Sequence, residues 1–171
     1  MEMTARRIQV RWTMAKDLNT PSEALVELSK DRNVNIRLMV AKNPNTPPRI
    51  LKRLSKSQNK DVRWKVAENP NTPLKVLVEL SKDENIGVRW GVAGNLNTPP
   101  EILKTFLKDR RPTVRMVLAT NRNTPSEALV ELSKDEHEGV LQKVIGNPNT
   151  PPEVLMYGKM RELVVKMIME S

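Results

Sequence analysis

The chain of 171 residues contains no cysteine. This absence excludes disulfides, thiolate zinc sites, iron–sulfur clusters and cysteine nucleophiles. It is compatible with the reducing environment of the cytosol. Any function must therefore be carried by other residue types.

Histidine is almost absent too, and no set of catalytic residues is recognisable. The one histidine, His137, stands in the acidic run Asp135-Glu136-His137-Glu138, where an exposed linker is favoured over a metal site. No glycine-rich loop has the spacing of a phosphate-binding motif. The sequence therefore predicts a protein that is not an enzyme and uses neither a metal nor a cofactor.

Long hydrophobic runs are also missing. Residues 1–11 lack an apolar core of signal-peptide length, and no run approaches the roughly 18 apolar residues that a membrane span needs. We expect a soluble, cytoplasmic protein that neither binds a membrane nor acts on a small-molecule substrate. Its net charge of +9 favours acidic partners, with nucleic acid first among them.

The most informative feature is a short motif, Asn-x-Asn-Thr-Pro, that recurs every 26 residues. Its six copies begin at Asp17 (with aspartate in place of the first asparagine), Asn43, Asn69, Asn95, Asn121 and Asn147. A fixed period of this length is the signature of a stacked repeat protein. The fold class predicted is an all-α α-solenoid of six repeats with two helices each.

The threonine of each motif is predicted to be a helix N-cap, because a hydroxyl followed by proline suits a helix start. Glutamate follows three residues later in four copies, which predicts capping boxes. Arg49 and Lys75 replace it in the other two. The paired asparagines, such as Asn43 and Asn45, are expected to bond loop backbone groups and to form a ladder along the stack.

Each repeat is expected to contain two short helices that are too short to be stable alone. The first carries Val-Arg-x-x-Val-Ala, as at residues 62–67, and the second is amphipathic, as from Pro47 to about Lys56. Residues 1–9 should lead into the first helix, residues 10–156 form the repeats, and residues 157–171 form a C-terminal capping helix. We expect one solenoid domain over residues 1–171.

These motifs resemble the leucine-rich repeat variant family, which is similar to HEAT repeats. The resemblance covers about residues 10–156 and rests on Val-Arg-x-x-Val-Ala, Asn-Pro-Asn-Thr-Pro-Pro and Leu-Ser-Lys-Asp. It implies a right-handed superhelix of short helices without a β-sheet, but no settled molecular function. HEAT-like relatives include protein scaffolds and nucleic-acid binders.

One arginine of each first helix lies between apolar positions, which suggests a structural role or a phosphate track. The structural interpretation is favoured, because a partly buried arginine needs carboxylate partners, and an aspartate ends most repeats. This predicted structural ladder consists of Arg11, Arg37, Arg63, Arg89 and Arg115.

Two candidate surfaces for nucleic acid remain. The basic excess is concentrated in the middle of the chain, since residues 36–61 hold seven basic residues and one acidic residue. On the second helices the outward cations are Arg49, Lys52, Arg53, Lys75 and Lys104, for which a merely solubilising face is the alternative. On the polar side of the first helices Gly91 and Gly94 would allow a ligand to approach closely. The candidates there are Lys16, Lys42, Lys65, Trp12, Trp64 and Trp90, and for the tryptophans packing between repeats is the alternative to base stacking.

The sequence thus predicts a non-catalytic scaffold that binds a macromolecule along its surface. Nucleic acid, bound with weak sequence specificity by the central basic repeats, is the leading hypothesis. A protein-interaction scaffold for an acidic partner is the alternative.

Overall fold

The computed structural model describes the backbone of residues 2–169 and the side chains of residues 5–158, 160 and 167. The described residues are helical, with no β-strand among them. The first helices are α1 (Glu2–Lys16), α3 (Val34–Lys42), α5 (Lys60–Glu68), α7 (Ile86–Gly94), α9 (Pro112–Thr120) and α11 (Glu138–Ile145). The second helices are α2 (Ser22–Leu28), α4 (Pro48–Leu54), α6 (Leu74–Leu80), α8 (Pro100–Lys104) with the 3₁₀ turn η1 (Thr105–Lys108), α10 (Ser126–Leu132) and α12 (Pro152–Met169). The predicted all-α solenoid is confirmed, whereas its right-handed turn and the count of six repeats stay predictions.

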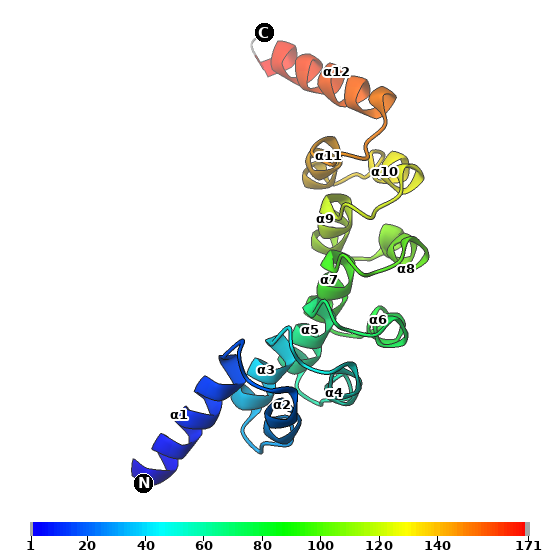
Figure 1. The fold of residues 1–171 in the computed structure, drawn as a ribbon. Helices are drawn as coiled ribbons and strands as arrows, with labels where there is room; N and C mark the ends of the chain where they lie inside the picture. Colours follow the sequence, from blue (N-terminus) through cyan, green and yellow to red (C-terminus); the bar gives the residue numbers. More distant parts are fainter. Residues whose placement is uncertain (1, 170–171) are drawn as a thin grey trace. The chain divides into compact units, whose positions relative to one another are not determined.

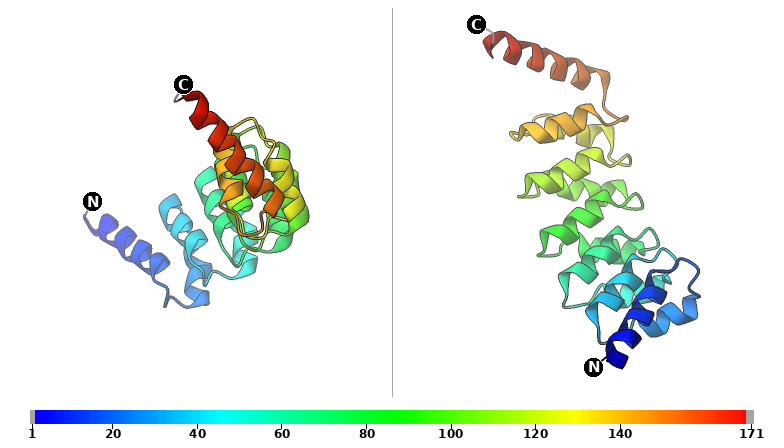
Figure 2. Two further views of the ribbon diagram at one scale, coloured as in Figure 1. Left: turned by 90° about the horizontal axis from the view of Figure 1, so that it is seen from above. Right: turned by 90° about the vertical axis from the view of Figure 1, so that its left-hand side faces the viewer.

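The chain forms two compact units, Met1–Asn97 and Thr98–Ser171. In the first unit α1, α3, α5 and α7 pack side by side as one row, and α2, α4 and α6 form a second row (Figures 1 and 2). Each second helix contacts the first helices before and after it, as α4 does with α3 and α5. In the second unit α9 packs against α11, α10 contacts both, and α11 contacts α12. That one domain spans residues 1–171 also stays a prediction.

From α3 to α11 the core is built from equivalent positions of successive repeats, because each helix buries apolar side chains on one side. Val62, Val66 and Ala67 of α5 are buried. On α4 the buried side chains are Ile50 and Leu51 together with Leu54. The amphipathic pattern of the sequence therefore identified the buried side of both helices.

The asparagine ladder expected from the sequence is present and crosses from repeat to repeat. The Nδ2 group of Asn69 donates to the backbone oxygens of Ala41 and Asn43 at 2.8 and 2.9 Å. Its Oδ1 accepts the backbone N–H of Asn71 at 2.9 Å. The same bonds to the preceding repeat start from Asn43, Asn95 and Asn147. Each amide thus satisfies carbonyl groups at the end of the previous first helix, which would otherwise lack a donor.

The predicted threonine N-caps were wrong. The residue that precedes each second helix is the proline, as at Pro47 before α4, and it makes no side-chain cap bond. Thr46 instead donates its hydroxyl to the backbone oxygen of Val40 at 2.5 Å, at the end of α3. The same bond is made by Thr20, Thr72, Thr124 and Thr150. Because the helix begins one residue later than expected, the threonine lies outside it, and the capping boxes do not form.

The structure also defines the N-caps of several first helices and the extent of the C-terminal helix. The N-caps of three first helices are Asn33, Asn59 and Asn85, whose side chains accept backbone N–H groups and which the repeat motif did not reveal. At the C-terminus, α12 runs from Pro152 to Met169 and so includes most of residues 157–171, the expected capping helix. Gly158 lies on α12 where a Cβ atom would stand 2.6 Å from the Cδ1 atom of Ile145, so glycine allows α12 to approach α11 closely.

Candidate binding surfaces

The ladder arginine of α5 lies beside the aspartate near the end of the same repeat. Arg63 on α5 donates from Nε and Nη2 to the two carboxylate oxygens of Asp83 at 2.7 and 3.0 Å. Its Nη1 also donates to the backbone oxygens of Ser57 and Gln58. The side chains of Arg63 and Asp83 are only 14% and 9% exposed. A two-pronged pair of this kind holds the guanidinium plane in one orientation.

Not every ladder arginine has the same partners. Arg115 repeats the arrangement with Asp135, at 2.5 Å from Nε and 2.9 Å from Nη2, and Arg11 Nε lies 2.7 Å from Asp31. For Arg37, the position that holds the aspartate in the other repeats is occupied by Ser57. The Nη1 group of Arg37 donates to the backbone oxygens of Asp31 and Arg32. Arg89 is buried and donates to the backbone oxygens of Asp83 and Glu84. These bonds direct the guanidinium groups toward the protein, which argues against a phosphate track.

The ion pairs shift the pKa values of the aspartates. Burial raises the pKa of Asp83, but hydrogen bonds from Arg63 and from the Asn85 backbone outweigh it, and the pKa lies below its usual value. The hydrogen bond from Arg115 lowers the pKa of Asp135 in the same way, against the effect of burial. Both carboxylates are therefore ionised more strongly in the folded chain than in the unfolded chain.

This shift predicts a loss of stability in acid. A carboxylate whose folded pKa lies below its unfolded pKa stabilises the fold fully above the unfolded value of about 3.9, and this contribution is lost as the pH falls through the folded pKa. The unfolding free energy should thus decline below about pH 4. Urea unfolding between pH 7 and pH 2.5 measures this decline. The Asp135→Asn variant should be less stable at pH 7 and show a shallower decline, and an unchanged acid profile would contradict this explanation.

The cations proposed on the second helices are all exposed. Arg49, Lys52 and Arg53 lie on α4, Lys75 on α6 and Lys104 on α8. Arg53 also donates to the hydroxyl of Ser29, at the end of α2, so it bridges two second helices while staying exposed. The sequence therefore placed these side chains on the outside correctly, and what they bind stays a prediction.

Carboxylates of neighbouring helices lie among these cations. Lys56 Nζ, just after α4, lies 2.6 Å from Glu79 on α6. The hydrogen bond from Lys56, with a weaker effect of Lys52, lowers the pKa of Glu79. Hydrogen bonds from its own backbone and from Ser22 lower the pKa of Glu23 on α2, with a smaller contribution from Arg49. The face is therefore basic in total but not of one sign.

Lysine and tryptophan of the first helices are partly engaged with one another. Lys65 Nζ lies 3.7 Å from the ring centre of Trp64 and 2.7 Å from Glu68 Oε2. Trp64 in turn packs edge-on against Trp90, with ring centres 6.1 Å apart. The positive charge of Lys65 thus has a carboxylate partner within its own helix. Elsewhere on the first helices, Lys16 and Lys42 are exposed, and Lys16 Nζ lies 5.3 Å from the ring centre of Trp12.

Glycine was expected on this polar side, where it would allow a ligand to approach. Gly94 is exposed, but Gly91 is buried, and a Cβ atom there would lie 3.0 Å from Ala67 Cβ and 3.0 Å from Trp64 Cδ1. Gly91 therefore allows α7 to approach α5. An open pocket of about 330 Å³ lies near the start of α5 and α7. It is lined by Trp64 and Trp90, with Lys60, Asp61 and Asn85 among the other lining residues. The tryptophans serve packing between repeats and also border this pocket.

The described part of the chain has neither a membrane-spanning helix nor a group of metal ligands. Its helices include none with the length and apolar character to cross a membrane. No three His, Asp or Glu side chains within it lie together as metal ligands would.

Comparison with known proteins supports the fold. No protein-family model and no curated protein matches the chain. A solved structure described as a leucine-rich repeat variant with a novel repetitive structural motif is similar, with 26% sequence identity and a TM-score of 0.61. The match covers 88% of this chain, which spans 64% of the other. An engineered protein also matches, with 17% identity, but its TM-score of 0.42 is too low to bear on the fold.

Proposed function

We propose that this chain, which has the repeat fold of a leucine-rich repeat variant, is a non-catalytic scaffold that binds nucleic acid through its second helices. The surface proposed is the outer side of α2, α4 and α6 together with the lysine two residues after the end of each, which we term the second-helix row. Its exposed charged residues are Lys30, Arg49, Lys52, Arg53, Lys56, Lys75 and Lys82, with Glu23, Glu27 and Glu79. The excess of seven cations over three carboxylates is the observation that supports the proposal.

The centre of the row is α4, which exposes Arg49, Lys52 and Arg53 without a carboxylate of its own. Cations held on rigid helices attract phosphates without reading bases, so weak sequence specificity is expected. Lys104 supplies a cation at the position of Lys52 on α8. The exposed Lys16, Lys42 and Trp90 of the first helices are a secondary surface, where a single strand could stack.

Salt dependence tests this proposal. If Arg49, Lys52, Arg53 and Lys75 each contact a phosphate of duplex DNA, log affinity should fall with log salt with a slope of about −3.6. Affinity should then drop about 100-fold between 50 and 200 mM salt. Fluorescence anisotropy with a labelled duplex and a labelled single strand measures both quantities.

Variants with equal charge changes provide the control. Lys52→Glu with Arg53→Glu should weaken binding and roughly halve the slope, since two contacts are lost. Arg122→Glu with Lys134→Glu changes the charge equally on exposed residues of the second unit and should have a much smaller effect. Absence of binding to DNA and RNA at 50 mM salt, or equal effects of the two pairs, would refute the proposal.

An acidic partner protein is the second candidate, and the interleaved carboxylates favour it. Glu79, beside Lys56, and Glu23 split the row into alternating charges, a pattern that pairs better with a protein surface than with a continuous phosphate chain. Binding of an acidic polypeptide such as polyglutamate, without binding of either nucleic acid at the same salt, would support this alternative.

A further inference from the structure

The first helix of the chain exposes a position that is buried in the other first helices. Val10 on α1 is 54% exposed. Its equivalents, 26 residues apart, are fully buried in α3, α5, α7 and α11; they are Ile36, Val62, Val88 and Val140. The difference arises from the neighbour, because the side chains are almost the same.

A second position on α1 behaves in the same way. Met14 is 43% exposed, whereas its equivalents Val40, Val66 and Val92 are fully buried. α3 packs against α1, and α5 packs against α3, so every later helix of this unit has a preceding first helix beside it. The exposed side of α1, formed by Val10, Thr13 and Met14, thus corresponds to a side that receives a helix in the rest of the row. We term it the α1 face.

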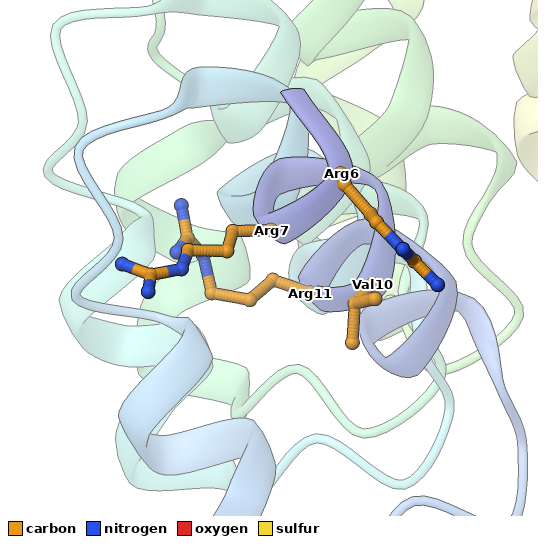
Figure 3. A pocket seen from close by; sticks show the side chains of 4 residues that line it. All are labelled: Arg6, Arg7, Val10 and Arg11. Atoms are coloured by element: carbon orange, nitrogen blue, oxygen red, sulfur yellow. The ribbon is translucent and has the colours of Figure 1, made fainter. Parts of the chain in front are cut away.

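Open space and positive charge adjoin the α1 face. An open pocket of about 260 Å³ is lined by Gln9, Val10, Thr13, Met14 and Asp17. A second pocket, of about 430 Å³, is lined by Arg6, Arg7, Val10 and Arg11. Figure 3 shows the guanidinium groups of Arg7 and Arg11 on one side of Val10 and that of Arg6 on the other. Arg11 is paired with Asp31, and Arg6 and Arg7 are exposed.

Asp17 argues against another 26-residue repeat as the occupant. Each later repeat has asparagine here, and Asn43 donates its Nδ2 group to the backbone oxygens of Ala15 and Asp17 in the preceding repeat. The Oδ1 atom of Asp17 accepts the backbone N–H of Asn19 at 2.9 Å, as the asparagine Oδ1 does in the later repeats. An ionised carboxylate has no proton to donate, so a preceding repeat would place its carbonyl oxygens against a negative charge. A second copy stacked as one more repeat is therefore disfavoured.

We propose that the α1 face binds an amphipathic helix of a partner protein whose apolar stripe is flanked by acidic residues. The apolar stripe would cover Val10 and Met14, as a preceding helix covers their equivalents, and the carboxylates would lie over Arg6 and Arg7. This is helix-in-groove recognition, in which anchors recur at i, i+4 and i+7. Exposed Val10, between the arginines, and exposed Met14 favour a helix over nucleic acid, because phosphates make no use of apolar side chains. The site is separate from the second-helix row.

A designed peptide tests the proposal. The probe is a labelled synthetic helix of about 18 residues with leucines at i, i+4, i+7 and i+11 and glutamates on both flanks. The matched probe has lysine in place of each glutamate. In anisotropy titrations with the full chain, the glutamate peptide should bind at least ten times more tightly than the lysine peptide.

Variants locate the site. Val10→Glu with Met14→Glu should weaken binding of the glutamate peptide at least tenfold, and Arg6→Gln with Arg7→Gln should weaken it and reduce its salt dependence. Leu74→Glu, at a residue equally exposed on α6, should leave binding unchanged. Because Val10 and Met14 are exposed, their replacement should not lower the melting temperature, which circular dichroism verifies.

Three results would overturn the proposal. The first is absence of glutamate-peptide binding at a peptide concentration of about 100 μM, which is ~100 times a dissociation constant of about 1 μM. The second is equal binding by the Val10→Glu, Met14→Glu variant. The third is a dimer in sedimentation velocity that dissociates when Val10 is replaced, since a second copy would then occupy the face.

Discussion

Replacing Arg63 with alanine is expected to lower the unfolding free energy by about 3–5 kcal/mol. The reason is that Asp83, whose side chain is only 9% exposed, would keep its charge and lose its two-pronged partner. The backbone oxygens of Ser57 and Gln58 would lose a donor as well. Urea unfolding followed by circular dichroism measures the change, and the melting temperature should fall by roughly 10 °C.

Arg37→Ala is the matched control, because Arg37 has the same place on α3 and the same Nη1 bonds to two backbone oxygens, but Ser57 stands where Arg63 has the carboxylate of Asp83. Its effect should be clearly smaller. A double-mutant cycle with Asp83→Ala isolates the ion pair, and the double variant should be more stable than the sum of the single losses implies. Equal stability of the Arg63→Ala variant and the unchanged chain would refute the structural role of the ladder arginines.

Replacing Asn69 with alanine is the second large effect, with an expected loss of about 2–4 kcal/mol. The buried amide of Asn69 donates to the oxygens of Ala41 and Asn43 and accepts the N–H of Asn71. Its removal leaves buried carbonyl groups of the preceding repeat with fewer donors, and an unsatisfied buried group costs more than the bond itself contributes. Thermal and urea unfolding measure the loss.

Two further variants test whether the bond to the preceding repeat is the cause. Asn69→Asp should be at least as damaging at pH 7, because it keeps the acceptor and places a charge beside the two carbonyl oxygens. Asp17→Asn gives the first motif the asparagine of the other five. In the described chain no preceding repeat lies beside this motif to accept the new donor, so the unfolding free energy should hardly change. A small effect of Asn69→Ala, no larger than that of Asp17→Asn, would show that the ladder contributes little.

The sequence predicted the fold well because its strongest signals are local or periodic. The 26-residue period and the amphipathic pattern identified both helices of each repeat, and the similarity to a solved leucine-rich repeat variant confirms the resemblance. The ladder of Asn43 and Asn69 was expected for the same reason, since equivalent side chains of stacked repeats must meet. The threonine caps failed because Thr46 and Pro47 suit a helix start equally well as residue types. Only the backbone shows that α4 begins after Pro47, which leaves Thr46 to bond the end of α3.

The candidate surfaces were predicted less completely. The exposed cations of α4 follow from the amphipathic pattern of that helix alone, and the structure places them outside as expected. The proximity of Glu79 to Lys56, 23 residues earlier, does not follow from any local pattern. Lys65 was a candidate for phosphate binding, but its contacts with Trp64 and Glu68 depend on side-chain conformations within α5. Gly91 was assigned to a ligand-facing side and instead lies between α7 and α5.

Periodicity was thus sufficient for the helical repeats, the ladder asparagines and the net positive charge of the central repeats, because these depend on residue type and spacing. Which arginine finds a carboxylate, which charges are neutralised by a neighbouring helix, and why Val10 is exposed while Val62 is buried depended on the packed chain. Equivalent residues in a repeat have the same local sequence, so their differences arise only from what lies beside them in space.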